Sequence, residues 1–163
     1  MTPAPLPARA LALRLLAIVL WAGSTAHAAV DVDAMWDYAR PAQSEARFRA
    51  ALAELQGPQR GASQDDDALV LQTQIARTLG LRGRFDEARA LLDAIEPSLP
   101  SAGPEPRVRA LLERGRMLRS SGQPVPARPL FVAAFELADA RGLPGLAADA
   151  LHTVALVEPT LEG

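Results

Sequence analysis

The sequence predicts an all-α protein, and three observations support this fold class. Between residues 41 and 157, apolar residues recur at intervals of three and four, the spacing that places them on one side of a helix. Proline and glycine interrupt this pattern and separate the helical segments. No stretch shows the sustained alternation of apolar and polar residues that is typical of a strand. We therefore expect helices joined by short loops, which makes sequential neighbours antiparallel.

The composition restricts the chemistry that the chain can perform. It has 163 residues, 49% of them hydrophobic, and a formal net charge of -2, values that suit one folded domain. There is no Cys, which excludes disulfides and thiolate metal sites. Nucleic-acid-binding surfaces usually make a domain strongly basic, so this charge balance gives no support for such a partner.

The first 28 residues differ from the rest of the chain. Two arginines precede a short apolar run over 15–22, and this segment contains no acid. The run is shorter than the roughly 20 residues that cross a bilayer. The sequence AHA at 26–28 fits the small-x-small pattern of a cleavage site. We predict a signal peptide over 1–28, cleaved near Ala28, and an exported, periplasmic protein; an uncleaved amphipathic leader is the alternative.

Residues 29–40 form a short lead that contains Trp36, and the first two helices are expected over 41–57 and 66–80. One side of the first helix carries Phe48, Ala51, Leu52 and Leu55. In the second helix, apolar residues recur every four positions, at Leu71, Ile75 and Leu79. The polar stretch between them is expected to be a loop.

The stretch 83–100 has the pattern of a turn, one amphipathic helix and a stop. The residues that share a face of this helix are Phe85, Ala88, Leu91, Leu92 and Ile95. A loop is expected over 98–106, followed by helices over 107–122 and 125–142. A last helix begins within 143–159.

Two of these helix pairs repeat one another, over 69–102 and 108–141. Aligned at an offset of 39 residues, Gly83 falls on Gly122, where each glycine supplies the backbone freedom that a tight turn needs. Large apolar residues also match large ones, and small residues match small ones. A helix-turn-helix unit that recurs in this way cannot bury its apolar face alone, so the units must stack on one another.

These repeats resemble the tetratricopeptide repeat family. That family has a small residue midway along the first helix, then a turn glycine, then small, bulky and alanine-like positions, and a closing proline. The residues that supply these positions are Ala76, Gly83, Ala88, Leu92 and Pro100 in the first repeat, and Gly115, Gly122, Ala127, Phe131 and Ala134 in the second. The second repeat departs from the pattern at Pro124, where an aromatic residue is expected, and at Asp139, where the final proline is expected.

The resemblance implies a fold and a kind of function. Antiparallel helix pairs over 41–163 would stack into a short right-handed α-solenoid, with small residues letting the two helices of a pair approach closely. The expected contacts are Ala76 against Ala88 and Gly115 against Ala127. The first helix of each pair would line a concave groove. Proteins with this fold hold a protein or peptide there, so we expect a non-enzymatic binding module that needs no cofactor.

Arginines recur at the positions expected to face this groove. The candidate partner-binding residues are Thr73, Arg77, Arg109, Arg116 and Arg119. Because a guanidinium makes paired hydrogen bonds with a carboxylate, an acidic segment or a C-terminal carboxylate is the ligand that we expect. The alternative is a solvated helix face, in which Glu113 pairs with Arg109 or Arg116.

Little in the sequence points to catalysis or to a metal. Beyond residue 28 the only histidine is His152, and its spacing supplies no Ser or Asp partner. The acids over 65–67 stand at the start of a helix, where three consecutive side chains cannot all face one Ca²⁺. We expect them to cap the helix and to complement its dipole.

The last predicted helix has an apolar stripe and no partner helix after it. The stripe consists of Leu146, Leu151, Val154, Ala155 and Leu156. An exposed stripe of this kind favours association. A second copy would cover it in a homodimer, or the chain is a fragment of a longer array and acts structurally.

Overall fold

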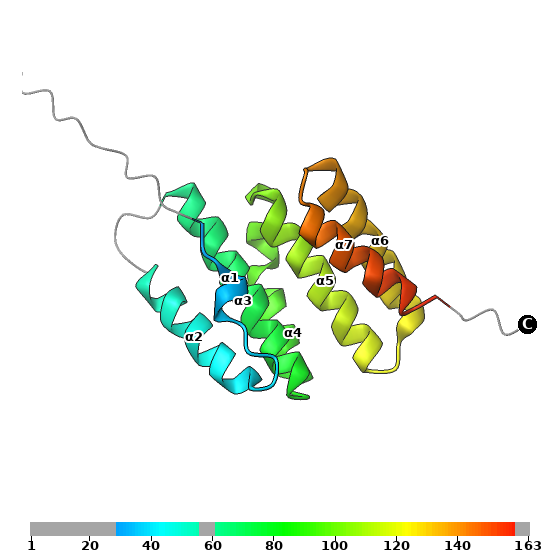
Figure 1. The fold of residues 1–163 in the computed structure, drawn as a ribbon, viewed down its shortest axis with the longest axis horizontal. Helices are drawn as coiled ribbons and strands as arrows, with labels where there is room; N and C mark the ends of the chain where they lie inside the picture. The colour runs from blue at the N-terminus through cyan, green and yellow to red at the C-terminus, as the bar shows by residue number, and fades with distance from the viewer. Residues whose placement is uncertain (1–28, 56–60, 159–163) are drawn as a thin grey trace, which may run out of the picture.

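The computed structural model describes residues 29–55 and 61–158 of the chain (Figure 1). These ranges form α1 (Val32–Met35), α2 (Pro41–Glu54), α3 (Ala62–Leu81), α4 (Phe85–Ile95), the 3₁₀ helix η1 (Glu96–Ser101), α5 (Pro104–Ser120), α6 (Pro124–Ala140) and α7 (Pro144–Ala155). No strand occurs within them, so the all-α prediction is confirmed. The signal peptide predicted over 1–28 lies outside the described residues and stays a prediction.

Proline sets the start of four helices. Pro41, Pro104, Pro124 and Pro144 are the first residues of α2, α5, α6 and α7. Proline suits this position because its fixed φ is helical and because the first N–H groups of a helix have no partner within it. The two starts predicted at 107 and 125 were therefore placed slightly late.

Three glycines end helices in the same way. Gly83, Gly122 and Gly142 have φ values of 72°, 78° and 67°. Each follows a helix, α3, α5 or α6, and the residue after each glycine donates its N–H to a carbonyl five residues back, at 2.9 Å in all three turns. This is the Schellman arrangement, in which glycine adopts the left-handed conformation without steric cost. The predicted roles of Gly83 and Gly122 are confirmed, and Gly142 is a third turn of the same type.

The segment after α4 differs from the prediction. Pro100 was expected to close this helix, but α4 ends at Ile95, and Pro100 lies inside η1 within the stretch predicted as a loop. The cause is Pro97, which has no N–H to continue the α-helical hydrogen bonds. The chain therefore continues in the tighter 3₁₀ form.

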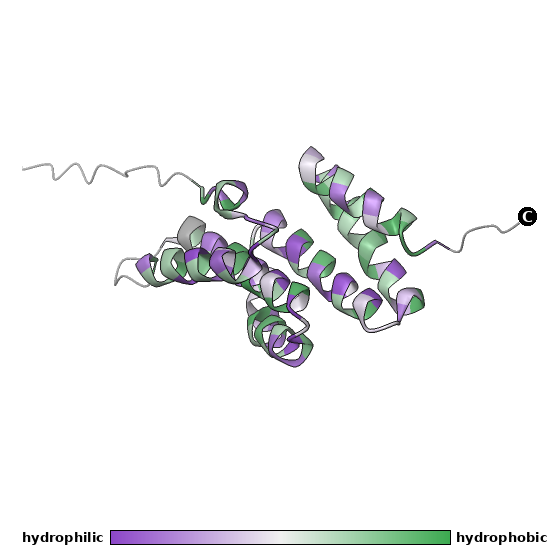
Figure 2. Ribbon diagram, turned by 60° about the horizontal axis from the view of Figure 1, so that its bottom comes forward, coloured by the Kyte–Doolittle hydropathy of each residue, from purple (hydrophilic) through white to green (hydrophobic). Residues whose placement is uncertain are grey.

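The helices enclose two apolar clusters that meet at α5. The first lies among α2, α3 and α4 and includes Phe48, Leu71, Ile75, Leu79 and Leu92. The second lies among α5, α6 and α7 and includes Val108, Leu112, Phe131 and Ala134. Hydrophobic and hydrophilic residues alternate along the helices in Figure 2, as expected when each helix has one buried side. Because α5 packs on both α3 and α6, it joins the two halves.

The small residues of the two repeats lie at buried positions. Ala76, Ala88 and Ala127 have almost no exposed surface, and Ala76 and Ala88 belong to the same cluster. Gly115 lies against the ring of Phe131, which is a different neighbour from the expected Ala127. A small residue on the first helix therefore leaves room for a large one on the second.

Candidate functional site

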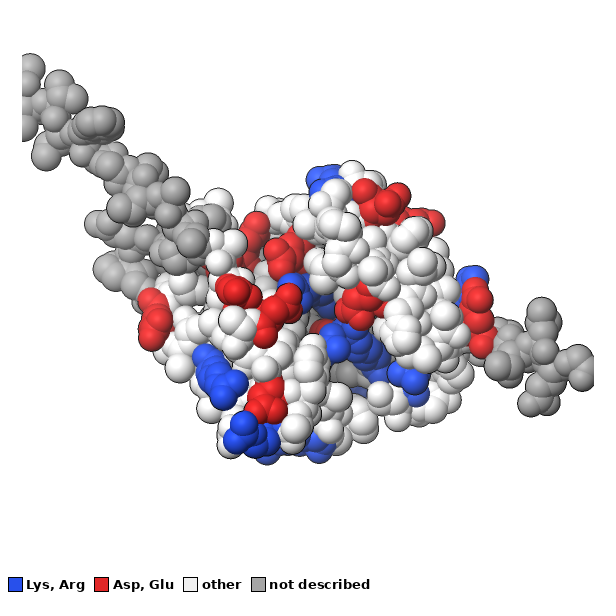
Figure 3. Space-filling view, viewed as in Figure 1, with Lys and Arg blue, Asp and Glu red and all other residues white. Residues whose placement is uncertain are grey.

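One depression crosses α3, α5 and α7. It consists of two hollows, of about 420 and 250 Å³, which share Arg77 of α3 and Asp149 of α7. Arg116, Arg119 and His152 line the larger hollow. We call the whole depression the α3/α5/α7 groove. Figure 3 shows arginine side chains gathered in a hollow at the middle of this face, with acidic side chains beside them.

The centre of the groove holds a closed ring of four charges. The Nη2 of Arg116 donates to both carboxylate oxygens of Asp149 at 2.6 Å, and its Nη1 donates to Glu113. The Nη1 of Arg77 lies 3.4 Å from Oε1 of Glu113 and 3.9 Å from Oδ2 of Asp149. Two positive and two negative charges from three helices therefore neutralise one another.

Two members of the charge ring are largely buried. The side chain of Glu113 is only 4% exposed and that of Arg116 is 17% exposed. Burial by itself lowers the pKa of the Arg116 guanidinium, but the charges of Glu113 and Asp149 and their hydrogen bonds outweigh it and raise the pKa above its ordinary value. Arg116 is therefore charged at neutral pH.

The N-terminal lead forms one wall of the smaller hollow. The rings of Trp36 and Tyr38 stack with their centroids 4.6 Å apart, and the guanidinium carbon of Arg77 lies 5.6 and 5.5 Å from those centroids. The indole N–H of Trp36 donates to the buried Gln74 on α3 at 2.9 Å. The ring of Trp36 also meets Phe48 of α2 edge-on. Part of α3 on the groove side is thus covered by the chain's own lead.

The predicted groove residues fall into three groups. Arg77 and Arg116 belong to the charge ring, and Glu113 pairs with them, as the alternative prediction proposed for Arg116. Arg109 lines the smaller hollow, but its Nε is bound by Glu105 at 2.8 Å. Arg119 is exposed, lines the larger hollow and has no ion pair within the described part of the chain.

Thr73 does not face the groove. It is buried, and its hydroxyl donates to the carbonyl of Val70 at 2.7 Å. The prediction was wrong because α3 packs against α2, α4 and α5, so most of its circumference is covered. Repeat spacing alone does not show which sides of α3 the neighbouring helices cover.

Sequence reasoning missed Asp149 and the aromatic pair of Trp36 and Tyr38. Asp149 lies 33 residues after Arg116, on the helix that follows the second repeat, and the 39-residue offset of the repeats does not place it there. The position of the aromatic pair had no signal, because the lead shows no helical pattern and reaches α3 only through tertiary contacts.

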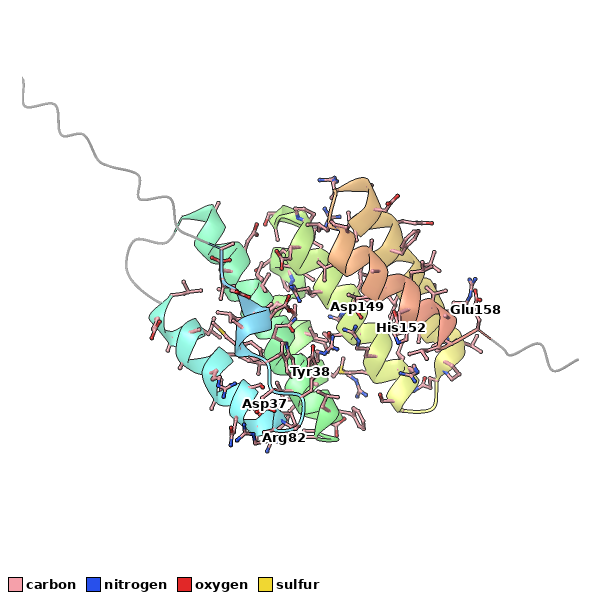
Figure 4. All side chains as sticks on the ribbon, viewed as in Figure 1. Asp37, Tyr38, Arg82, Asp149, His152 and Glu158 are labelled. Atoms are coloured by element: carbon pink, nitrogen blue, oxygen red, sulfur yellow. The ribbon has the colours of Figure 1, made fainter. Side chains whose placement is uncertain are left out.

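The larger hollow also brings together Ser120, Asp149 and His152. Figure 4 shows Asp149 and His152 on α7, where they lie on the same side of the helix. Across the described residues, no hydrogen bond joins His152 to either of the other two side chains. Those residues also contain no group of three acids or histidines placed to hold a metal ion. Within the described ranges, no helix is both long and apolar enough to span a membrane.

No protein family, curated protein or solved structure matches this chain.

Proposed function

We propose that this protein is an exported helical-repeat module of the tetratricopeptide type, which binds a segment of another protein in the α3/α5/α7 groove. The observation that carries the proposal is that one depression crosses α3, α5 and α7, the first helices of successive pairs. Support for the repeat comes from Gly83 and Gly122, which occupy equivalent positions and end their helices with the same backbone geometry. Export rests on the sequence pattern over 1–28.

The charges of the groove restrict the ligand chemistry. Of the four arginines expected to bind a carboxylate, Arg77, Arg109 and Arg116 already have acidic partners. Arg119 is the arginine whose guanidinium is available, and Leu81 and Leu156 line the same hollow. We infer a ligand with one carboxylate, from an acidic side chain or a C-terminus, next to an apolar side chain.

The test is binding to immobilised random peptides with free or amidated C-termini. The chain with Arg119→Glu is compared with the original, and Arg141→Glu, an exposed arginine on the α6–α7 turn, is the matched control. Of the two variants, we expect only Arg119→Glu to abolish capture of the peptides. Equal capture by all three proteins would assign no role to Arg119, and no capture of any peptide by the original protein would argue against a peptide-binding groove.

A second candidate function is self-association through α7. Helix α7 buries Ala147, Ala150 and Thr153 against its neighbours, whereas Leu151 remains 55% exposed and Leu156 46% exposed. Light scattering as a function of concentration tests this candidate. A dimer that Leu151→Glu dissociates would support it, and a monomer at all concentrations would exclude it.

A further inference from the structure

A second depression lies between α4 with η1 on one side and α6 on the other, with α5 as its floor. It consists of two hollows, of about 360 and 190 Å³, which share Arg114 and Leu130. We call it the α4/α6 furrow. None of its residues lines the larger hollow of the α3/α5/α7 groove except Met117, so the two depressions are separate surfaces.

Apolar side chains line most of the furrow. Leu111 and Leu118 come from α5, and Leu130 and Leu137 come from α6. Each pair is seven residues apart, which is two helical turns or about 10 Å. All four side chains are only partly buried. The furrow therefore presents two leucines from α5 and two from α6, and the two on each helix are spaced two helical turns apart.

The packing of the helices explains why this surface is open. In the first half of the molecule, α2 packs closely on the α3 that follows it. The contact between α4 and α5, where the two halves meet, is slight by comparison. Pro97 ends the α-helical path after Ile95, and η1 then leads the chain to α5 by a longer route. As a result, α5 lacks a close helical neighbour on one side, and this side is the floor of the furrow.

Three arginines and two acids line the furrow, so the formal charge of its lining is +1. Arg114 donates to Asp93 and Glu96, the two acids that line the furrow, at 2.8 Å each and to the carbonyl of Leu92 at 3.0 Å, so both acids already have a cationic partner. Arg107 lines the larger hollow and has no ion pair in the described ranges. Arg89 lines the smaller hollow, and its nearest acid, Asp86, lies 3.3 Å away in an exposed pair. Arg107 is therefore the lining arginine that has no acidic partner in the described part of the chain.

We propose that the α4/α6 furrow binds one amphipathic helix of a partner protein, with leucine-like residues on one face and acidic residues on its flank. Two rows of leucine, two turns long, match the apolar residues that a helix presents at positions i, i+4 and i+7. An acidic residue on the flank of that helix meets Arg107, which has no acidic partner in the described residues. This inference does not depend on the function proposed for the α3/α5/α7 groove.

The probe for the test is a designed amphipathic helix with leucines at i, i+4 and i+7 and glutamates on one flank, labelled with a fluorophore. A second helix has lysines in place of the glutamates. We expect the full chain to bind the glutamate helix at least about tenfold more tightly than the lysine helix, and we expect added salt to reduce this difference. Equal affinity for the two helices, or no binding of either, would overturn the proposal.

Two variants place the binding site. Arg107→Glu should reverse the preference and favour the lysine helix, because it replaces the available cation with an acid. Arg141→Glu makes the same charge change on an exposed turn outside the furrow and should alter neither affinity. Circular dichroism serves to check that both variants are folded. A preference unchanged by Arg107→Glu, or changed equally by Arg141→Glu, would show that the furrow is not the binding site.

Discussion

The ring of Phe131 occupies the space that a side chain at position 115 would need. A Cβ atom added to Gly115 would lie 2.8 Å from Cδ1 and Cζ of that ring and closer still to Cε1. Gly115 is on α5, Phe131 is on α6, and both are buried. The two helices of this pair therefore approach closely because one residue is minimal and the other fills the space beside it.

The first prediction concerns this contact. Gly115→Ala should lower the free energy of unfolding by about 1–3 kcal/mol, because the added Cβ would overlap the fully buried ring of Phe131 and force the packing to shift. Gly80→Ala is the control, since Gly80 is also helical but an added Cβ meets no atom within 4 Å. That change should be neutral or stabilise the fold by about 0.5–1 kcal/mol. Urea denaturation measures both, and equal effects would contradict the packing argument.

A second prediction concerns the turn between α5 and α6. Gly122 has φ of 78° and open space around it, so Gly122→Ala should cost about 1–2 kcal/mol through backbone strain and not through a clash. Gly122→Asn should cost less, because asparagine visits the left-handed region more readily than alanine. Thermal unfolding of the two variants measures the loss of stability in each. Equal loss for alanine and asparagine would point away from the backbone as the cause.

The charge ring gives a third prediction. Arg116→Met should destabilise the fold by about 3–5 kcal/mol, because it leaves the buried Glu113 with only the longer contact to Arg77. A double-mutant cycle with Asp149→Asn should give a coupling energy of about 0.5–3 kcal/mol. Arg128 and Glu158, an exposed pair 3.1 Å apart, serve as the control, with an expected coupling of about 0.2–1 kcal/mol. Coupling in the ring no larger than in the control would mean that solvent screens the ring.

A fourth prediction concerns the lead. Trp36→Phe keeps an aromatic ring against Phe48 but removes the donor to Gln74, whose side chain is buried. The unpaired amide oxygen should cost about 1–3 kcal/mol. Tyr38→Phe is the matched control, because the Tyr38 side chain is 60% exposed, and its hydroxyl makes no hydrogen bond in the described residues. Thermal unfolding should separate the two variants, and a Trp36→Phe protein as stable as the control would contradict this role for the indole N–H.

A fifth prediction concerns pH. A side-chain hydrogen bond from Arg84 holds the pKa of the Glu87 carboxyl below its ordinary value of 4.5. A carboxyl with a lowered pKa in the folded state stabilises the fold above the unfolded pKa, and this contribution is lost as pH falls through the folded pKa. The original protein should therefore exceed Glu87→Gln in thermal midpoint at neutral pH. The difference should shrink as the pH falls below 4.5 and vanish below the folded pKa of Glu87.

The control for this pH prediction is Glu136→Gln, at an exposed glutamate with no ion pair in the described residues. This variant should show no such convergence with the original protein. If the difference in thermal midpoint between the original protein and Glu87→Gln stays constant down to acid pH, the pair with Arg84 is not its cause.

The sequence by itself determined the helical class, the turn glycines and the approximate extent of the main helices. These features are local. Proline fixes φ and removes a donor wherever it occurs, and a glycine such as Gly83 adopts a left-handed φ without a steric penalty. The spacing of apolar residues likewise identifies the buried side of one helix without any knowledge of its neighbours.

Only the tertiary structure decided which charges are available. Glu113 meets Arg77 across 36 residues, and Arg116 meets Asp149 across 33. Each of these contacts depends on how two helices are rotated and spaced against each other. Periodicity does not specify that rotation, because side chains on any uncovered part of a helix satisfy the same pattern. A row of arginines in the sequence thus becomes, in the folded protein, a neutralised ring with Arg119 exposed beside it.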